Sequence, residues 1–162
     1  MCGYDDFDAF FRADFAHLVA FLCKAGFEAE TARDIATEAM LHAFEAWPTI
    51  EDPRAWVRRT AGRLLAGSEH VRDEWTPFPG GDSDELAALV EPHSQIIRLL
   101  ADLPDQQRMV LMWSLDGFTP AQIAKALNLS PATVRSNLRH VRERLKRHHG
   151  AARPDRAREE ER

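Results

Sequence analysis

The sequence predicts an all-α protein made of two small helical bundles joined by a flexible linker. Large apolar residues recur at steps of three and four along most of the chain, which is typical of amphipathic helices, and no segment alternates like a strand. Proline, glycine and acidic residues interrupt this pattern. Two closely spaced helix start signals lie beyond the interruption. We therefore divide the chain into residues 1–74, a linker at 75–93, residues 94–150 and a disordered charged tail at 151–162.

Three helices are expected in the first bundle. The first carries apolar residues from Phe7 onward and stops at Gly26, because glycine readily adopts the left-handed conformation that ends a helix. The second spans residues 28–46. The third begins with Asp52 as its N-cap and Pro53 at the first helical position. The buried side of the second helix is expected to comprise Ala32, Ile35, Ala36, Ala39, Met40, Ala43 and Phe44.

The most specific pattern is a predicted helix-turn-helix near the end of the chain. Thr119 with Gln122 three residues later forms a capping box, and Ser130 gives a second start signal; each start is followed by proline. Two starts this close leave room only for a tight turn. Asn128 lies at that turn, and asparagine tolerates the left-handed backbone almost as well as glycine. The expected helices of this bundle are a first one that ends at Pro104 and three more over 105–115, 120–127 and 131–148. The apolar face of the first consists of Ile96, Leu99, Leu100 and Leu103.

The last predicted helix has an apolar side and a basic side. Val134, Leu138 and Val141 recur at helical spacing and hold one side against the bundle. Arginine near the start of an exposed helix can pair with guanine in the major groove, whereas the alternative is a helical hairpin with a solvated basic face. The residues expected to contact DNA are Ala132, Arg135, Ser136, Arg139, His140 and Arg142. Arg147 is expected to contact phosphate.

Several classes of protein find no support in the sequence. A phosphate-binding glycine loop, a G-x-S-x-G elbow and an H-E-x-x-H pair are all missing, so we expect no enzyme and no cofactor. Two cysteines without C-x-x-C spacing, and neighbouring histidines that cannot point at one metal ion, predict no metal site. No apolar run approaches the roughly 20 residues of a membrane span, so a cytoplasmic location is expected. Cys23 is expected to be a buried, inert thiol.

Three stretches carry a resemblance to a known family. They are LADLPDQQRMVLMWSLDGFTPAQIAKALNLSPATVRSNLRHVRERL (100–145), TARDIATEAMLHAFEAW (31–47) and PRAWVRRTAGRLL (53–65). The chain resembles a bacterial RNA polymerase sigma factor of the extracytoplasmic-function (ECF) type. The first stretch is similar to region four, which docks the polymerase beta flap and reads the upstream promoter element. The other two are similar to region two, which binds the beta-prime clamp and reads and melts the downstream element.

The resemblance implies two sets of contact residues in the first bundle. Asp34, Glu38 and Leu41 lie on the outward side of the second helix, where the resemblance implies that they bind the basic clamp helices of core RNA polymerase. A merely solvated acidic face would have the same composition. In the third helix, Trp56, Arg58 and Arg59 could stack an unpaired base and hold phosphate of the downstream element, although Trp56 fits the core equally well.

Two alternatives to a working sigma factor stay open. One is a helix-turn-helix transcriptional regulator whose first bundle binds a protein or a small ligand. The other is a sigma-like protein that binds polymerase or an anti-sigma partner without productive promoter melting. The second alternative draws on residues 63–70, where the chain departs from the family's asparagine-leucine-alanine-x-aspartate run and its pair of arginines.

Overall fold

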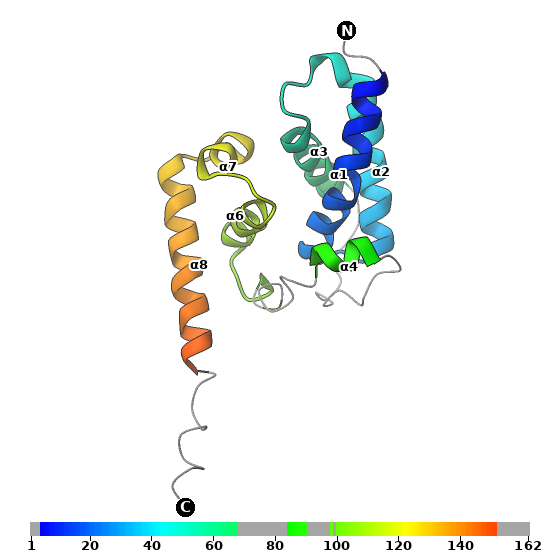
Figure 1. Cartoon of the computed structure of the whole chain (residues 1–162). Helices are drawn as coiled ribbons and strands as arrows, with labels where there is room; N and C mark the ends of the chain where they lie inside the picture. The colour runs from blue at the N-terminus through cyan, green and yellow to red at the C-terminus, as the bar shows by residue number, and fades with distance from the viewer. Residues whose placement is uncertain (1–3, 68–83, 91–97, 99, 152–162) are drawn as a thin grey trace, which may run out of the picture. The chain divides into compact units, whose positions relative to one another are not determined.

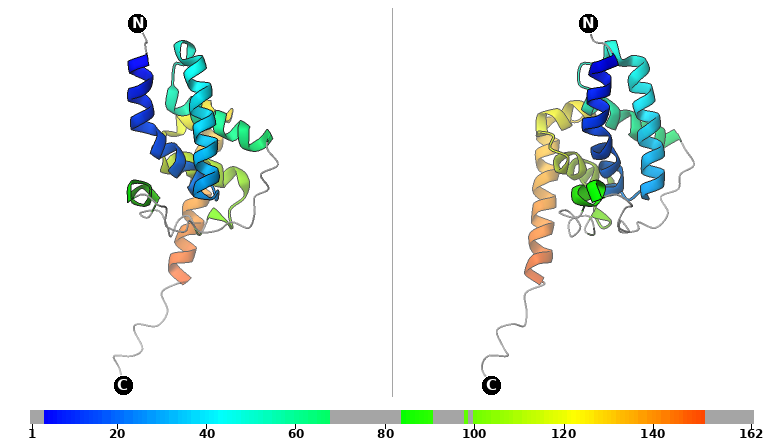
Figure 2. Two further views of the ribbon diagram at one scale, coloured as in Figure 1. Left: turned by 90° about the vertical axis from the view of Figure 1, so that its right-hand side faces the viewer. Right: turned by 45° about the vertical axis from the view of Figure 1, so that its right-hand side comes forward.

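The computed structural model (Figures 1 and 2) describes residues 4–67, 84–90, 98 and 100–151. Every regular element in these residues is a helix, which confirms the all-α prediction. The chain divides into two units, Met1–Ala101 and Asp102–Arg162. None of the described helices combines the length and the apolarity that crossing a bilayer requires.

The predicted domain boundaries are not tested by this structure. Those near residues 74 and 93 fall outside the described part of the chain, as do residues 152–162 of the predicted tail and most of the predicted linker. These boundaries stay predictions.

The first unit contains the three helices that the sequence predicts. They are α1 (Tyr4–Lys24), α2 (Ala29–Ala46) and α3 (Pro53–Gly67), with a short 3-10 helix, η1 (Trp47–Thr49), after α2. Helices α1 and α2 run side by side in opposite directions (Figures 1 and 2), and both contact α3.

Local signals end α1 and start α3 as predicted. Gly26, two residues after the end of α1, adopts a positive φ of 98°, and the Phe27 amide donates to the Leu22 carbonyl across it. The Ala55 amide donates to Asp52 Oδ1 at 3.1 Å, so Asp52 caps α3.

The core of the first unit draws on all three helices. Leu18 and Leu22 of α1, Met40 of α2 and Val57 of α3 are each at most 2% exposed. Burying one such side chain contributes about 1.5–3 kcal/mol relative to leaving it in water. Small buried residues of α2 let the neighbouring helices approach closely; they are Ala32, Ala36, Ala39 and Ala43.

One residue of the predicted buried stripe is not buried. Phe44 is 38% exposed, which corrects the expectation that it belongs to the core. Its ring lies at the edge of the stripe and meets the Phe7 ring of α1 edge-on, with 5.1 Å between the centroids. Phe7 also packs against Trp47 and Phe11. A partly exposed aromatic cluster therefore covers this end of the α1–α2 pair.

A fourth helix of the first unit lies within the predicted linker. Helix α4 (Asp84–Val90) contacts α1. A helix of seven residues is unstable alone. Its contact with α1 is therefore what stabilises it.

The second unit contains α6 (Asp105–Leu115), α7 (Pro120–Leu127) and α8 (Pro131–Ala151). The first two match the predicted bounds, and α8 continues past residue 148, where the sequence predicted its end. Helix α7 lies across the N-terminal end of α8 (Figure 1). The core is built around Trp113, which packs against Phe118 with 4.8 Å between ring centroids. Side chains from the other two helices complete it: Ile123, Val134 and Val141.

Candidate nucleic-acid interface

The turn between α7 and α8 has the geometry that the sequence predicts. The Thr119 amide donates to Gln122 Oε1 at 2.8 Å, and the Gln122 amide donates to Thr119 Oγ1 at 3.3 Å, which completes the capping box. Asn128 adopts the left-handed conformation, with φ 54° and ψ 45°. The Leu129 amide then donates to the Ala124 carbonyl at 2.9 Å. These bonds fix the direction in which the chain enters α8.

The start of α8 is held by a second cap. The Thr133 amide donates to Ser130 Oγ at 3.0 Å, and the two hydroxyls lie 2.8 Å apart. Val134, one residue later, is fully buried and anchors this end of the helix against the unit. The first turns of α8 are therefore rigidly placed, as a recognition helix requires.

The outer side of α8 carries the predicted DNA-contacting residues. Arg135 and Arg139 are both exposed, so neither guanidinium is taken up by packing. Ser136 is half-buried beside them. The remaining members of the predicted set are also exposed: Ala132, His140 and Arg142.

Asn137 points the other way. It is only 8% exposed, and its Nδ2 donates to Oε1 of Gln106 on α6 at 3.2 Å. This residue therefore couples the recognition helix to α6 rather than facing outward. The sequence predicted no partner for Asn137, because Gln106 lies 31 residues away.

The predicted polymerase-binding residues lie on the surface of α2. Asp34 and Glu38 are exposed. Among the described residues, Leu41 and Phe44 are the two exposed large apolar side chains, and Leu41 is the more exposed of them, at 56%. Phe44 lies one turn after Leu41 and extends the apolar area toward α1. Exposed leucine and phenylalanine side chains flanked by carboxylates are typical of a surface that binds a partner with basic and apolar residues.

Arg58 contradicts the expectation that it holds phosphate. Its side chain is 0% exposed, and its two terminal nitrogens donate to the Asp14 carboxylate at 2.7 and 3.1 Å. Its guanidinium also lies 5.7 Å from the centre of the Phe21 ring. Asp14 and Arg58 are 44 residues apart in the chain, so helix periodicity alone gave no sign of the pair. This bidentate ion pair joins α1 to α3 inside the unit.

Arg59 lies between the core and the surface. The residue is half-buried, and its Nε is buried without a hydrogen-bond partner among the described residues. Arg59 therefore reaches the surface only in part, whereas the sequence analysis placed it beside Arg58 in one phosphate-binding pair.

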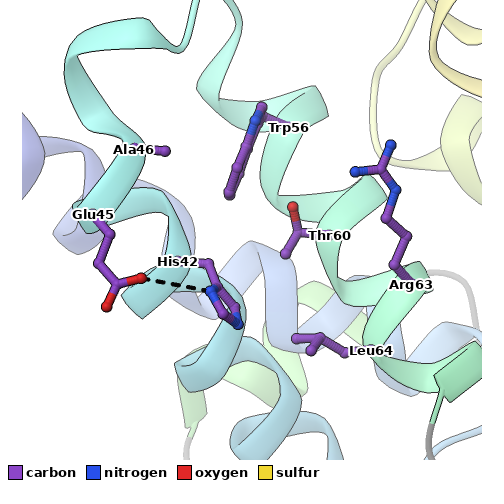
Figure 3. A pocket seen from close by; sticks show the side chains of 7 residues that line it. All are labelled: His42, Glu45, Ala46, Trp56, Thr60, Arg63 and Leu64. Atoms are coloured by element: carbon purple, nitrogen blue, oxygen red, sulfur yellow. Dashed lines mark ion pairs between the residues drawn. The ribbon is translucent and has the colours of Figure 1, made fainter.

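Trp56 lines an open groove between α2 and α3. The groove has a volume of about 490 Å³, and Figure 3 shows the Trp56 ring standing between the two helices. Trp56 is half-buried, so it is neither a fully buried core residue nor a freely exposed one. His42 Nδ1 lies 3.7 Å from Glu45 Oε2 on the α2 side. The other lining residues are Ala46, Thr60, Arg63 and Leu64.

The other polar residues of this groove were not predicted as site residues from the sequence. Thr60 and Arg63 follow Trp56 at steps of four and three on α3, which places all three on one side of the helix. That spacing could have predicted that Thr60 and Arg63 share a site with Trp56. The sequence could not predict the position of His42 in the groove, because that depends on how α2 packs against α3.

The described residues contain no group of three or more metal-ligating side chains. The one free cysteine described, Cys23, is buried, and this burial raises the pKa of its thiol from 9.0 to about 12. Cys23 is therefore an unreactive core residue rather than a nucleophile.

The second unit is a helix-turn-helix module with an exposed basic recognition helix. Residues 93–145 match the family model for sigma-70, region 4. The matched residues include all of α6 and α7 and most of α8, so the second unit is a sigma-factor-like DNA-binding module. No curated protein matches the chain.

Proposed function

We propose that this chain is an ECF-type sigma factor that binds core RNA polymerase and directs promoter-specific initiation of transcription. The observation that carries the proposal is the exposure of Arg135 and Arg139 on a rigidly capped recognition helix within the region that matches sigma-70 region 4. In this role the N-terminal half of α8 enters the major groove of the upstream element, where arginine pairs with guanine O6 and N7.

Polymerase binding is assigned to both units. The exposed line of Asp34, Glu38 and Leu41 supports docking of α2 on the basic clamp helices of the beta-prime subunit, and Phe44 enlarges the apolar contact. The match to region 4 supports docking of the second unit on the beta flap. An anti-sigma factor would be a further partner of the same surfaces.

The downstream element is assigned to the groove between α2 and α3. Trp56 supplies a flat aromatic surface on which an unpaired base can stack, and exposed Arg63 supplies a cation for the adjoining phosphate. Arg58 takes no part, because Asp14 holds it in the core.

This role needs no catalytic residue, cofactor or metal ion in the chain itself, since the polymerase performs the chemistry. It also requires the chain to meet polymerase and chromosome in the cytoplasm.

The test is reconstituted transcription. Purified core polymerase is mixed with the full chain and with duplex templates that carry sequences selected by the chain from a random pool. Initiation at one defined position, dependent on the chain and lost when the selected sequence is scrambled, would support the proposal. Core polymerase that starts no RNA at a defined site in the presence of the chain would contradict it.

Burial of Arg58 favours a second candidate function. A sigma-like protein that docks polymerase but melts promoters poorly would lack part of the cationic surface expected on α3. Templates with a pre-opened downstream element distinguish a working sigma factor from this second candidate. The second candidate predicts transcription only from pre-opened templates, whereas a working sigma factor uses both.

A further inference from the structure

Four cations of α8 form one line along the helix. Arg135, Arg139, Arg142 and Lys146 follow one another at steps of four, three and four, so at 100° per residue they lie within about 60° of one another. All four are exposed, and none forms an ion pair with another described residue. We call these residues the α8 basic stripe. It is continuous because α8 is one uninterrupted helix to Ala151.

The stripe is longer than the major groove is wide. A rise of 1.5 Å per residue places Lys146 about 16 Å along the axis from Arg135, whereas the groove is about 12 Å across. If the first turns of α8 lie over base edges, Arg142 and Lys146 lie where the helix leaves the groove. The DNA groups found at that edge are the phosphates of the backbone.

Arg147 does not belong to the stripe, although it is exposed and adjacent to Lys146. It lies about 100° around the helix from Lys146. Exposed Glu143 precedes Arg147 by four residues, the spacing and order in which an acid and a base on a helix attract each other. The geometry therefore favours Lys146 over Arg147, the residue that the sequence analysis expected to contact phosphate.

We propose that Arg142 and Lys146 form a phosphate-contacting segment of α8 that binds duplex DNA regardless of its sequence and aligns the base-reading turns of the helix. This inference rests on the proposed DNA-reading role of the second unit. It divides that role in two: Arg135 and Arg139 discriminate between sequences, while Arg142 and Lys146 add affinity for every sequence.

The matched pair Lys146→Ala and Arg147→Ala tests this division in the full chain. Both substitutions remove one exposed cation, from neighbouring positions of the same helix, and alanine favours the helical state. Binding to a selected duplex and to its scrambled counterpart is measured over a range of salt concentrations. Each phosphate contact contributes about 0.9 to the slope of log affinity against log salt.

We expect Lys146→Ala and Arg142→Ala each to make that slope shallower, by about 0.9, on both duplexes. Arg147→Ala should leave the slope unchanged. Equal slopes for Lys146→Ala and Arg147→Ala would overturn the inference. A loss of affinity in Lys146→Ala or Arg142→Ala that is confined to the selected duplex would also overturn it.

Failure of the inference and failure of the proposed function give different results. If the unmodified chain binds neither duplex, both fail. If it prefers the selected duplex and Arg135→Ala removes that preference, the DNA-reading role stands. If Lys146→Ala and Arg147→Ala then have the same salt slope, only the phosphate-contacting segment is rejected.

Discussion

The two units place their charged residues in opposite ways. The first buries a carboxylate and a guanidinium together, Asp14 with Arg58, and carries exposed acids on α2. Among the described residues of the second unit, no charged side chain is buried, and exposed cations line α8. Opposite surface charges suit different partners, since a basic protein surface and a DNA backbone cannot be attracted by the same face.

The units also differ in what fixes their geometry. The turn of the second unit depends on hydrogen bonds between residues three to five positions apart, such as Thr119 with Gln122. The first unit depends on a pair 44 positions apart. This difference teaches that local sequence determines the shape of the DNA-binding turn, whereas long-range packing determines which α3 side chains reach the surface.

Reversing charge on α2 should have the largest effect. We expect Asp34→Lys combined with Glu38→Lys to abolish co-purification with core polymerase, because two attractions toward a basic partner become repulsions. Binding of the chain to duplex DNA should persist. The control is Asp5→Lys with Asp6→Lys, the same charge change at exposed positions of α1. Unchanged co-purification of the α2 variant would show that polymerase does not dock there.

Breaking the buried ion pair should destabilise the first unit alone. Asp14→Ala leaves Arg58 charged and buried without its partner, so we expect a loss of about 3–5 kcal/mol in the free energy of unfolding. Arg54 also approaches Asp14, at 3.5 Å, but its side chain is 46% exposed, so Arg54→Ala should cost about 1 kcal/mol or less.

Hydrogen exchange measured by mass spectrometry can separate the two units. The Asp14→Ala variant should show faster exchange in α1 to α3 and unchanged exchange in α6 to α8. Replacing both partners, Asp14→Leu with Arg58→Met, should recover most of the loss, because no unpaired charge stays buried. If Asp14→Ala is as stable as the unmodified chain, the ion pair does not hold α1 to α3.

Removing a base-reading arginine should have a moderate and selective effect. We expect Arg135→Ala to weaken binding to a selected duplex by about 1–3 kcal/mol and binding to scrambled DNA by much less. Electrophoretic or fluorescence titration with both duplexes measures the difference. Equal losses on the two duplexes would remove Arg135 from base reading.

Changes at the turn should have a smaller effect, confined to stability of the second unit. Asn128→Val places a β-branched side chain in the left-handed conformation, and we expect a cost of about 1–2 kcal/mol. Asn128→Gly is the matched control and should be nearly neutral, because glycine adopts this conformation freely. Urea denaturation followed by circular dichroism tests both. Equal stabilities of the two variants would show that the backbone at Asn128 is not constrained.

Buried Cys23 should make the stability of the first unit depend on pH in the alkaline range. Because burial raises its pKa from 9.0 in the unfolded chain to about 12, its contribution to stability is complete below pH 9 and is lost as the pH rises toward 12. In a Cys2→Ser variant, we expect the remaining thiol to react with a disulfide reagent only after the first unit unfolds. Rapid labelling of the folded chain at pH 8 would contradict the burial of Cys23.

Sequence alone predicted the elements that depend on near neighbours. The bounds of α6 and α7, the cap at Thr119 and the left-handed Asn128 all follow from residues within one or two turns of each other. The exposure of Asp34 and Arg135 also agrees with helix periodicity, because residues opposite an apolar stripe face away from the core.

Tertiary structure decided the residues that lie at the edges of those stripes. Arg58 is buried because a carboxylate on another helix meets it, and α4 forms because α1 supports it. Phe44 packs against Phe7 of another helix yet stays 38% exposed. The physical reason is the same in each case. A hydrogen-bonded turn is complete within a few residues, whereas the environment of a boundary side chain is set by whichever distant residue packs against it.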